Sequence, residues 1–293
     1  MLPERATDLP NFDELWDYNN PRETEARFRA LLPHARESGD VSYLAQLLTQ
    51  IARAQGLQGK FKAAHATLDE AQGLLRDDHH VARIRYLLER GRVFNSLQRS
   101  TQAREFLHQA WDLARQKGED YHAVDAAHMM GIVEPPDRQL EWSQRALYLA
   151  TRSTDPRARE WLGPLYNNIG WTYHDLRRYD EALIHFRKGL EWRQRQKQPR
   201  ETRIAAWTFA RGLRSVGRYE EALEIQRDNL QQAESSGEVD GLIQEELAEC
   251  LLAQGQQEEA REHFARAYEL LSQDDWLRKH EPARLQRLQQ LSE

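Results

Sequence analysis

Cysteine is almost absent from the sequence, because Cys250 is the only one in 293 residues. A single thiol cannot form an internal disulfide, and it cannot build the paired-cysteine sites that hold structural zinc. The eleven histidines are scattered, and the adjacent pair His79 and His80 falls where one predicted helix ends and the next begins. We therefore expect no metal and no cofactor, and we expect Cys250 to be a small buried core residue.

Motifs that carry catalysis are also missing. The sequence has no HExxH string, no phosphate-binding glycine loop and no G-x-S-x-G string. His174 and Asp175 are neighbours in sequence, but successive side chains on a helix point about 100° apart, so this pair does not predict a catalytic dyad. These absences favour a protein that is not an enzyme.

Lysine is scarce, with six residues in the chain, so almost all of the positive charge is arginine. The formal net charge of −6 is acidic overall. A basic domain is the usual signature of a nucleic-acid binder, so we expect no nucleic-acid partner. Local patches of arginine remain compatible with this composition.

Long apolar runs are lacking as well. No stretch approaches the roughly 20 apolar residues of a membrane span, and the N-terminus has no apolar run of the length that a signal peptide needs. We therefore expect no membrane partner and a cytoplasmic location, for a whole protein or for a domain of a larger one. No segment alternates with period two, which predicts an all-helical fold without strands.

One stretch stands out against this background, residues 166–190 with the sequence YNNIGWTYHDLRRYDEALIHFRKGL. It predicts two helices joined by a turn at residues 176–178. Gly170 and Ala182 are small residues placed where the two antiparallel helices must approach closely, and large residues stand beside them. The slots on the two helix faces are filled by Tyr166, Ile169, Gly170, Tyr173, Ala182 and Phe186.

Copies of this pattern recur along the chain. Aligned on the alanine of the second helix, GRYEEALEIQ places Ala222 forty residues after Ala182, and GQQEEAREHF places Ala260 thirty-eight residues further on. Earlier copies give Ala64 and Ala103, and a poorer copy at EPPDRQLEWSQRAL puts Gln139 in the alanine slot. The breaks between copies recur independently at intervals of 37 to 43 residues, at Gly39, Asp78, Gly118, Asp155, Gln198-Pro199, Gly237 and Asp275.

The filled slots match the tetratricopeptide signature W-x2-L-G-x2-Y…A-x3-F, with Tyr166 in place of the leading tryptophan. The chain therefore resembles the tetratricopeptide-repeat family. Its repeats exceed the roughly 34 residues usual there, and this longer form looks like that of kinesin light chains and bacterial peptide-sensing regulators. The resemblance implies a right-handed α-solenoid of about six helix-turn-helix repeats with a capping helix at each end.

The repeat pattern divides the chain into four parts. We predict an acidic-aromatic tail at 1–20, an N-terminal capping helix at 21–38, six repeats over 39–275 and a C-terminal capping helix at 276–293. In the third repeat Pro135-Pro136 predicts a shortened second helix. In the final helix, interrupted at Pro282, we expect an inward face of Trp276, Leu277, Leu285, Leu288 and Leu291.

The tail allows two interpretations. Its aromatic residues, within the string NFDELWDY at 11–18, could cover the exposed core edge of the first helices. Alternatively, the string could act as a tethered ligand for the basic groove of the same chain or of a neighbour. The sequence leaves both interpretations open.

The resemblance also implies a ligand-binding groove, because in this family the first helix of each repeat lines the concave face. The slots that face a ligand carry over to this chain as Arg53, Arg85, Arg92, Asn95, His128, Asn167, Trp171, His174, Trp207, Arg211 and Arg214. The same slots also include Gln46, Thr49, Tyr121, Val124, Asp175, Ser215, Glu245 and Glu249.

This set favours a peptide ligand. Arginine binds carboxylates in a bidentate manner, asparagine amides can hold an extended backbone, and tryptophan supplies contact area with little rotamer entropy to lose. The predicted partner is a protein or peptide with an acidic or C-terminal segment. The plainer alternative is that some of these arginines pair with Glu89 or Asp125 of neighbouring helices, which would indicate nothing about ligands.

The chaperone-tail carboxylate clamp of some relatives is disfavoured, because Asn168 matches only one of its positions.

Taken together, the sequence predicts a non-catalytic interaction module that binds a partner segment in an arginine- and tryptophan-lined groove. Two alternatives stay open. One is a peptide-sensing regulator whose superhelix changes on ligand binding, and the other is a scaffold that forms homo-oligomers through its terminal helices or tail.

Overall fold

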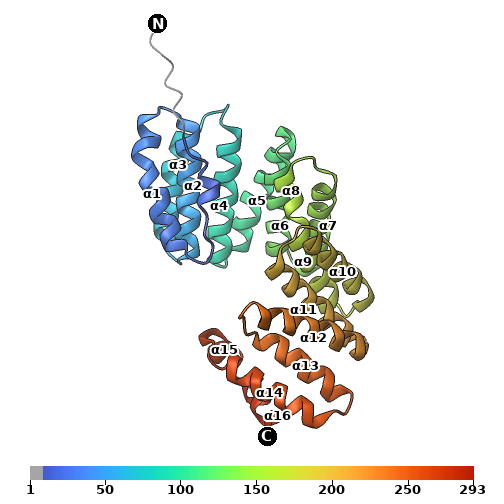
Figure 1. Ribbon diagram of the computed structural model, residues 1–293. Coiled ribbons are helices and arrows are strands. Elements are labelled where there is room, and N and C mark those ends of the chain that lie inside the picture. Colours follow the sequence, from blue (N-terminus) through green and yellow to red (C-terminus); the bar gives the residue numbers. More distant parts are fainter. Residues whose placement is uncertain (1–8) are drawn as a thin grey trace. The chain divides into compact units, whose positions relative to one another are not determined.

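The computed structural model describes residues 9–293, apart from the side chains of residues 136 and 137. Over this range the chain is helical and contains no strand, as the sequence predicts (Figure 1). The helices pair along the chain in the helix-turn-helix manner. Their bounds are η1 Phe12–Leu15, α1 Pro21–Glu37, α2 Val41–Leu57, α3 Phe61–Leu74, α4 His80–Ser96, α5 Ser100–Lys117, α6 Asp120–Val133, α7 Pro136–Arg152, α8 Pro156–Glu160, α9 Leu162–Asp175, α10 Tyr179–Arg195, α11 Pro199–Ser215, α12 Tyr219–Ser235, α13 Gly241–Ala253, α14 Gln257–Leu271, α15 Asp275–His280 and α16 Pro282–Ser292.

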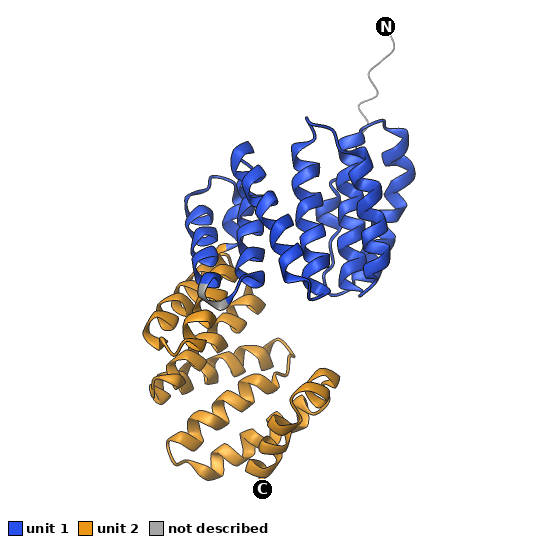
Figure 2. Cartoon of the chain, turned by 180° about the vertical axis from the view of Figure 1, so that it is seen from behind, with its two compact units in different colours: residues 1–161 blue, residues 162–293 orange. Residues whose placement is uncertain are grey.

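The chain divides into two compact units, unit 1 at Met1–Trp161 and unit 2 at Leu162–Glu293 (Figure 2). Each unit is a stack of helix pairs. The bounds of the tail, the repeats and the caps that the sequence predicts follow the repeat period instead, and they stay a prediction.

Unit 1 stacks the pairs α2/α3, α4/α5 and α6/α7, with α1 packed against α2. The first helices of successive pairs lie side by side, α2 against α4 and α4 against α6, whereas α3 and α5 make at most slight contact. Because the second helices are spread apart, the first helices form the inner layer of the stack. Its core includes Phe28, Leu47 and Ile51, each with 0% of its surface exposed.

Unit 2 stacks the pairs α9/α10, α11/α12 and α13/α14, with α16 packed against α14. Small residues let the helices of the first pair, α9 and α10, approach closely, as the sequence predicts. A Cβ atom added at Gly170 would lie 2.4 Å from the Phe186 ring, so only glycine lets α9 approach α10 this closely. Ala182, the small residue predicted on the second helix, is 1% exposed.

Most breaks between helices lie where the sequence predicts them. Gly118 ends α5 in the left-handed conformation with φ of 71°, which glycine adopts without steric cost. The turns after α4 and α9 contain no glycine, and there Gln98 and Arg177 take positive φ values of 60° and 58° instead.

Two expectations about local structure are wrong, and one feature was not predicted. The second helix of the third repeat is not shortened, since α7 spans 17 residues; Pro136 occupies its first turn, where the missing N–H costs nothing. The first helix of the fourth repeat is split into α8 and α9 at Trp161. Finally, Trp276 is 57% exposed and stacks on His280 with ring centroids 4.8 Å apart, while Leu277, Leu285 and Leu288 are buried as expected.

Candidate functional site

The surface formed by the first helices of each unit is the candidate site, and we call it the first-helix face. In unit 1 it belongs to α2, α4 and α6, and in unit 2 to α9, α11 and α13. The predicted ligand-facing residues divide between the two units. Unit 1 holds Arg53, Arg85, Arg92, Asn95 and His128, and unit 2 holds Asn167, Trp171, His174, Trp207, Arg211 and Arg214.

A chain of ion pairs joins the three helices of unit 1. An Arg53 guanidinium nitrogen lies 3.1 Å from Glu89, Arg92 lies 2.7 Å from the same carboxylate, and Arg92 also pairs with Asp125. The pairing with Glu89 and Asp125 that the sequence suggests as the plainer alternative is therefore present. Burial opposes the charge of Asp125, but Arg92 and Arg53 outweigh it and hold the pKa of the Asp125 carboxyl below its ordinary value.

Arg85 pairs with a carboxylate from the N-terminal segment, which we define as residues 10–18. Both terminal nitrogens of Arg85 donate to Asp13, one of them over 2.9 Å. In the same segment the indole nitrogen of Trp16 donates to Gln50 over 3.0 Å. The segment passes over α2 and α4 before it turns into α1 (Figure 1). The first-helix face of unit 1 is thus covered by the chain's own N-terminal segment.

The remaining predicted residues of unit 1 have mixed positions. Asn95 and His128 are half-buried, and the ring of His128 lies 4.9 Å from that of Trp161. Burial lowers the pKa of His128. Thr49 and Val124 do not face a ligand, since both are 0% exposed, and Thr49 donates to the carbonyl of Gln46 over 2.6 Å.

In unit 2, aromatic rings replace the ion pairs at the centre of the face. The rings of Trp171 on α9 and Trp207 on α11 lie 6.3 Å apart, and Trp171 also contacts Phe186 at 5.2 Å. The Trp207 indole nitrogen donates to the carbonyl of Leu242 over 3.0 Å, which fixes its ring against α13. His174 contacts Trp171 at 5.2 Å, and burial lowers its pKa.

A pocket of about 210 Å³ opens between α9, α10 and α11, next to these tryptophans. Phe186 forms part of its wall, and the amides of Asn167 and Asn168 line one side. On the α11 side Ile204 is 53% exposed although it is aliphatic. The charged residues in the lining are Arg193 and Glu201. Asn168 was not among the ligand-facing slots carried over from the family, so sequence reasoning missed its place here.

The arginines of unit 2 are paired, like those of unit 1. Arg214 makes two hydrogen bonds of 2.8 Å to Glu246, and Arg211 lies 3.4 Å from the same carboxylate. Burial raises the pKa of Glu246 to about 7, and Arg214 opposes this rise. The acidic slots predicted on α13, Glu245 and Glu249, pair with Arg284 and Arg287 of α16.

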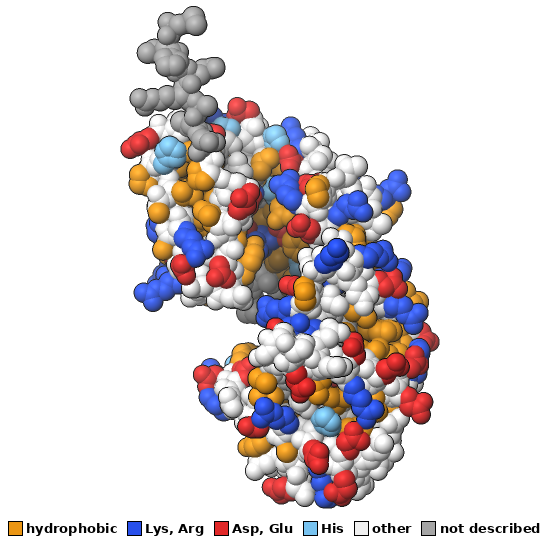
Figure 3. All heavy atoms as spheres, in the orientation of Figure 1, with side chains coloured by type: hydrophobic (Ala, Val, Ile, Leu, Met, Phe, Trp, Pro, Cys, Tyr) orange, Lys and Arg blue, Asp and Glu red, His pale blue; other side chains and the backbone are white. Residues whose placement is uncertain are grey.

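Every arginine of the predicted site is therefore partnered by a carboxylate of the chain. In the space-filling view, basic and acidic side chains are intermingled over the visible face of each unit (Figure 3). The strongly basic groove that the sequence predicts is largely neutralised. Binding on these faces has to rely on exchange of ion-pair partners or on apolar and amide contacts.

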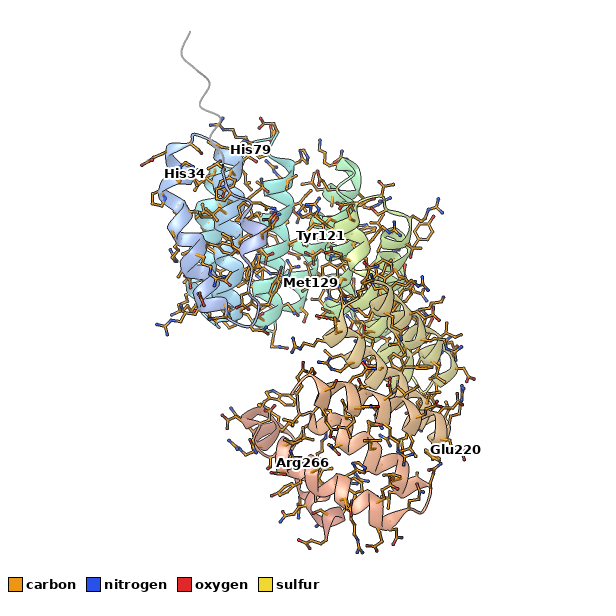
Figure 4. All side chains as sticks on the ribbon, viewed as in Figure 1. His34, His79, Tyr121, Met129, Glu220 and Arg266 are labelled. Carbon is orange, nitrogen blue, oxygen red and sulfur yellow. The ribbon has the colours of Figure 1, made fainter. Side chains whose placement is uncertain are left out.

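No group of three or more His, Cys, Asp or Glu side chains in the described part of the chain is arranged to hold a metal ion. His79 lies just before α4 (Figure 4) and His80 approaches Glu119 at 3.2 Å. No described helix combines the length and apolar character that crossing a bilayer requires. Cys250 is buried, as expected.

Two family models, both described as tetratricopeptide repeat, match residues 163–196 and 201–273. Both matches fall within unit 2. No curated protein is significantly similar to the chain in sequence.

Solved structures with similar folds are repeat proteins of low sequence identity. A signal transduction ATPase with numerous domains from Pyrococcus horikoshii, which carries a tetratricopeptide repeat sensor, is 16% identical over 94% of this chain, with a TM-score of 0.72. The match spans 43% of that ATPase. The apo form of RapI is 13% identical over 90% of this chain and 76% of its own, with a TM-score of 0.68. NprR in complex with its cognate peptide NprX is 16% identical over 95% and 81%, with a TM-score of 0.54.

Proposed function

Because the chain is a tetratricopeptide-repeat protein, we propose that the first-helix face of unit 2 binds an extended peptide segment of a partner and that the chain itself performs no catalysis. The observation that carries this proposal is the pocket between α9, α10 and α11, with two asparagine amides on one side and two tryptophans beside it. Function in repeat proteins resides in such surface positions rather than in the fold.

The pocket would take one apolar side chain of the ligand. Its volume of about 210 Å³ is smaller than the roughly 300–1,000 Å³ of pockets that enclose small-molecule ligands, so a single side chain fits it better than a cofactor. Ile204 at its mouth is exposed in the free protein. Covering this residue and the pocket wall would supply the apolar part of the binding energy.

The asparagines would hold the backbone of the ligand. The side-chain nitrogen of Asn167 donates to Oδ1 of Asn168 over 3.3 Å, and Oδ1 of Asn167 accepts from the Thr208 hydroxyl over 3.4 Å. The side-chain nitrogen of Asn168 donates no hydrogen bond to another described residue. It can therefore donate to a peptide carbonyl, as an asparagine amide offers two donors and one acceptor oxygen.

Arg211 would orient the ligand through charge. It lies two helical turns from Ile204 on the same face of α11, and its ion pair with Glu246 is long, at 3.4 Å. The side chain of Arg211 is 31% exposed, against 20% for Arg214, the other arginine on this face. A carboxylate in the ligand, from an acidic residue or a C-terminus, can share this guanidinium. The similar fold of NprR, solved in complex with its cognate peptide NprX, supports this class of ligand.

A peptide selection on the full-length chain tests the proposal. A displayed library of random 12-residue peptides is panned against the immobilised protein, and the enriched peptides are measured by fluorescence polarisation. We expect binders whose affinity falls at least 10-fold in Ile204→Glu. The ligand's apolar side chain would have to bury the new carboxylate at the pocket mouth, and removing that charge from water costs free energy.

The matched control is Ile184→Glu. Ile184 lies on α10 in the same unit and is 53% exposed, as is Ile204, but it does not line the pocket. Affinity in this control should stay within two-fold of the native chain. Equal loss in the two variants, or no loss in either, would place peptide binding elsewhere.

A regulatory form of this function is the second candidate, because RapI and NprR share the fold over most of this chain. In that form the bound peptide changes how the helix pairs stack. Small-angle scattering with and without a selected peptide separates the two forms, since a simple docking module keeps its scattering profile. Light scattering at increasing concentration tests the third possibility, a homo-oligomeric scaffold.

A further inference from the structure

The N-terminal segment lies on the first-helix face of unit 1 in the manner of a bound peptide. Its carboxylate at Asp13 is held by Arg85, and the phenyl ring of Phe12 lies under the same guanidinium at 5.4 Å. The guanidinium of Arg53 lies 5.8 Å from the Trp16 ring and 5.5 Å from the Tyr18 ring. Two of the slots predicted to face a ligand, Arg53 and Arg85, thus contact this segment.

The segment contains the short helix η1 and is held on α2 and α4 by side chains of those two helices. Between Pro10 and Trp16 the hydrogen bonds to α2 and α4 end on side chains: the Tyr43 hydroxyl donates to the Pro10 carbonyl over 2.8 Å, and Trp16 donates to Gln50. Phe12 is 5% exposed, whereas Tyr18 is 58% exposed. Phe12 belongs to the same buried apolar cluster as Phe28, and Leu15 and Trp16 pack against that cluster, so the segment also covers the edge of the unit 1 core. It combines these apolar anchors with a carboxylate that is paired with Arg85.

The face beneath the segment is incompletely satisfied. Buried polar atoms without a hydrogen-bond partner in the described chain include Nε of Arg85, Nε of Arg53, Oε2 of Glu89 and both ring nitrogens of His122. All of these residues belong to α2, α4 and α6. Unsatisfied buried polar groups are uncommon in folded proteins and call for an explanation, such as a ligand that would complete them.

Space is also left beside Asp13. A pocket of about 400 Å³ lies between residues 9–13 and the side chains of Arg85, Glu119, His122 and Arg157. His122 is 3% exposed, and its Nδ1 lies 3.6 Å from the Glu119 carboxylate. Arg157 pairs with Asp155 at the rim. In a ligand with more carboxylates than the segment, further oxygens can accept hydrogen bonds from Arg85 and Arg157 at this place.

We propose that the first-helix face of unit 1 is a second recognition surface, specific for acidic-aromatic peptide segments, and that residues 10–18 are its exchangeable intramolecular occupant. The external ligand is a partner segment in which one or more carboxylates stand next to aromatic residues. It displaces the chain's own segment from Arg85, Arg53 and Gln50. This surface is separate from the pocket of unit 2 and does not depend on it.

Tethering sets how strongly the face is protected. A short linker gives a tethered segment an effective concentration on the order of millimolar, so an external peptide of micromolar affinity competes poorly with it. Substitutions that weaken the binding of residues 10–18 to this face should therefore raise its apparent affinity for a separate peptide of the same sequence. A permanent structural plug would show no such exchange.

The experiment uses a fluorescein-labelled peptide of residues 9–20, LPNFDELWDYNN, and the full chain. The opened chain carries Phe12→Ala, Asp13→Ala and Trp16→Ala, which remove the three anchors of its own segment. Fluorescence polarisation should show that the opened chain binds the peptide at least 10-fold more tightly than the native chain. A peptide with Asp13→Asn should bind about 2- to 5-fold more weakly, because an ion pair at this exposure contributes up to about 1 kcal/mol.

Two arginine variants of the opened chain locate the site. Arg85→Ala should weaken binding at least 10-fold. Arg90→Ala is the matched control, because Arg90 lies on the same helix, is 6% exposed against 8% for Arg85, and pairs with Asp69 on the opposite side. Affinity in the control should change less than two-fold. A folded opened chain that does not bind, or that binds equally with Arg85→Ala, overturns the proposal.

Hydrogen exchange on the native chain decides the case even if the opened chain does not fold. The amide of Asp17 donates to the Thr24 hydroxyl over 3.1 Å, and the amide of Glu14 donates to the Asn11 carbonyl over 3.3 Å. For an exchangeable occupant these amides should exchange at least 100-fold faster than those of Leu47 and Ile51 in α2. Equal protection would mean that the segment leaves only on global unfolding, and the proposal would fail.

Discussion

The two units use the same helix pairing but present opposite kinds of first-helix face. In unit 1 the face is a network of buried ion pairs centred on Glu89, and the N-terminal segment lies over it. In unit 2 the centre of the face is two tryptophans and a pocket lined by asparagine amides. The small residues that let paired helices approach are alike in both units. The two faces therefore differ in the residues that do not take part in helix pairing.

Helix spacing explains part of this difference. In unit 1 α2 packs closely along α4, whereas in unit 2 α9 and α11 barely touch. The wider gap in unit 2 leaves room for the pocket over Phe186. In unit 1 the close packing of α2 on α4 brings Arg53 within ion-pairing distance of Glu89 instead.

The largest expected effect comes from breaking the buried network of unit 1. Arg92→Ala should lower the free energy of unfolding by about 3–5 kcal/mol, because removing one partner leaves a buried carboxylate uncompensated. Asp125 and Glu89 keep only 8% and 4% of their side-chain surface exposed. Urea unfolding followed by circular dichroism measures the loss.

The counterpart in unit 2 should cost less. Arg214→Ala leaves Arg211 close to Glu246, whose pKa burial already raises to about 7, so that this carboxylate can take up a proton. A loss in Arg214→Ala as large as that in Arg92→Ala would contradict the contrast between the two faces.

A pH-dependent contribution should come from Glu25 in unit 1. Burial would raise its pKa, but hydrogen bonds from Arg29, Gln58, Lys60 and Gln55 outweigh burial and lower it from 4.5 to about 2. A lowered pKa stabilises the folded state above about pH 4.5, and this stabilisation is lost as pH falls from about 4.5 to about 2. At about 1.4 kcal/mol per pKa unit this lowering corresponds to about 3.5 kcal/mol, which solvent screening reduces, so we expect Glu25→Gln to cost roughly 2–3 kcal/mol at neutral pH.

Urea unfolding of the native chain and of Glu25→Gln at neutral pH and near pH 3.5 measures this contribution. The difference between the two chains should shrink at the lower pH, because glutamine does not titrate. A difference that stays constant would mean that the interactions of Glu25 do not depend on its charge.

The close approach of helices in unit 2 is tested by Gly170→Ala. The added Cβ would lie 2.4 Å from the Phe186 ring, which must move. We expect a loss of about 1–3 kcal/mol, as for other overpacked cores, and a reshaped pocket with weaker peptide binding. Gly73→Ala is the control, since a Cβ there meets nothing within 4 Å. Unchanged thermal stability in Gly170→Ala would show that the helices separate easily.

The smallest effect is expected for Asp13→Asn. Asp13 is 39% exposed, and ion pairs at this exposure contribute about 0–1 kcal/mol, so global stability should fall by less than about 1 kcal/mol. Exchange of the Glu14 amide should nevertheless become faster while that of Ile51 stays unchanged. Uniformly faster exchange along the chain would tie the segment to the core of unit 1.

Sequence periodicity predicted the fold well, because the repeat pattern is set by packing that each pair must satisfy. The glycine at 170 and the alanines at 64, 103, 182, 222 and 260 are buried where the pattern requires small residues. Local details were harder. The split at Trp161 and the full length of α7 depend on how single prolines sit in a first helical turn, which the period does not encode.

The candidate site was predictable only in part. Family slots placed Trp171, Trp207, Arg53 and Arg85 on the first helices, because those slots follow from repeat register. Apart from the Arg92–Glu89 pair within α4, the carboxylates that these arginines meet lie 32 to 72 positions away in the sequence, as with Asp13 and Arg85. The pocket, too, depends on how far α9 and α11 stand apart, and no local signal in the sequence reports that distance.

Hydrogen exchange on the full chain, with and without a peptide selected for binding, is the most direct test of a peptide site on unit 2. We expect new protection in α9 and α11, around Asn168 and Ile204, with the outward part of α10 around Ile184 unchanged. Protection confined to α10 and α12, or none in unit 2, would contradict a peptide site on the first-helix face of that unit.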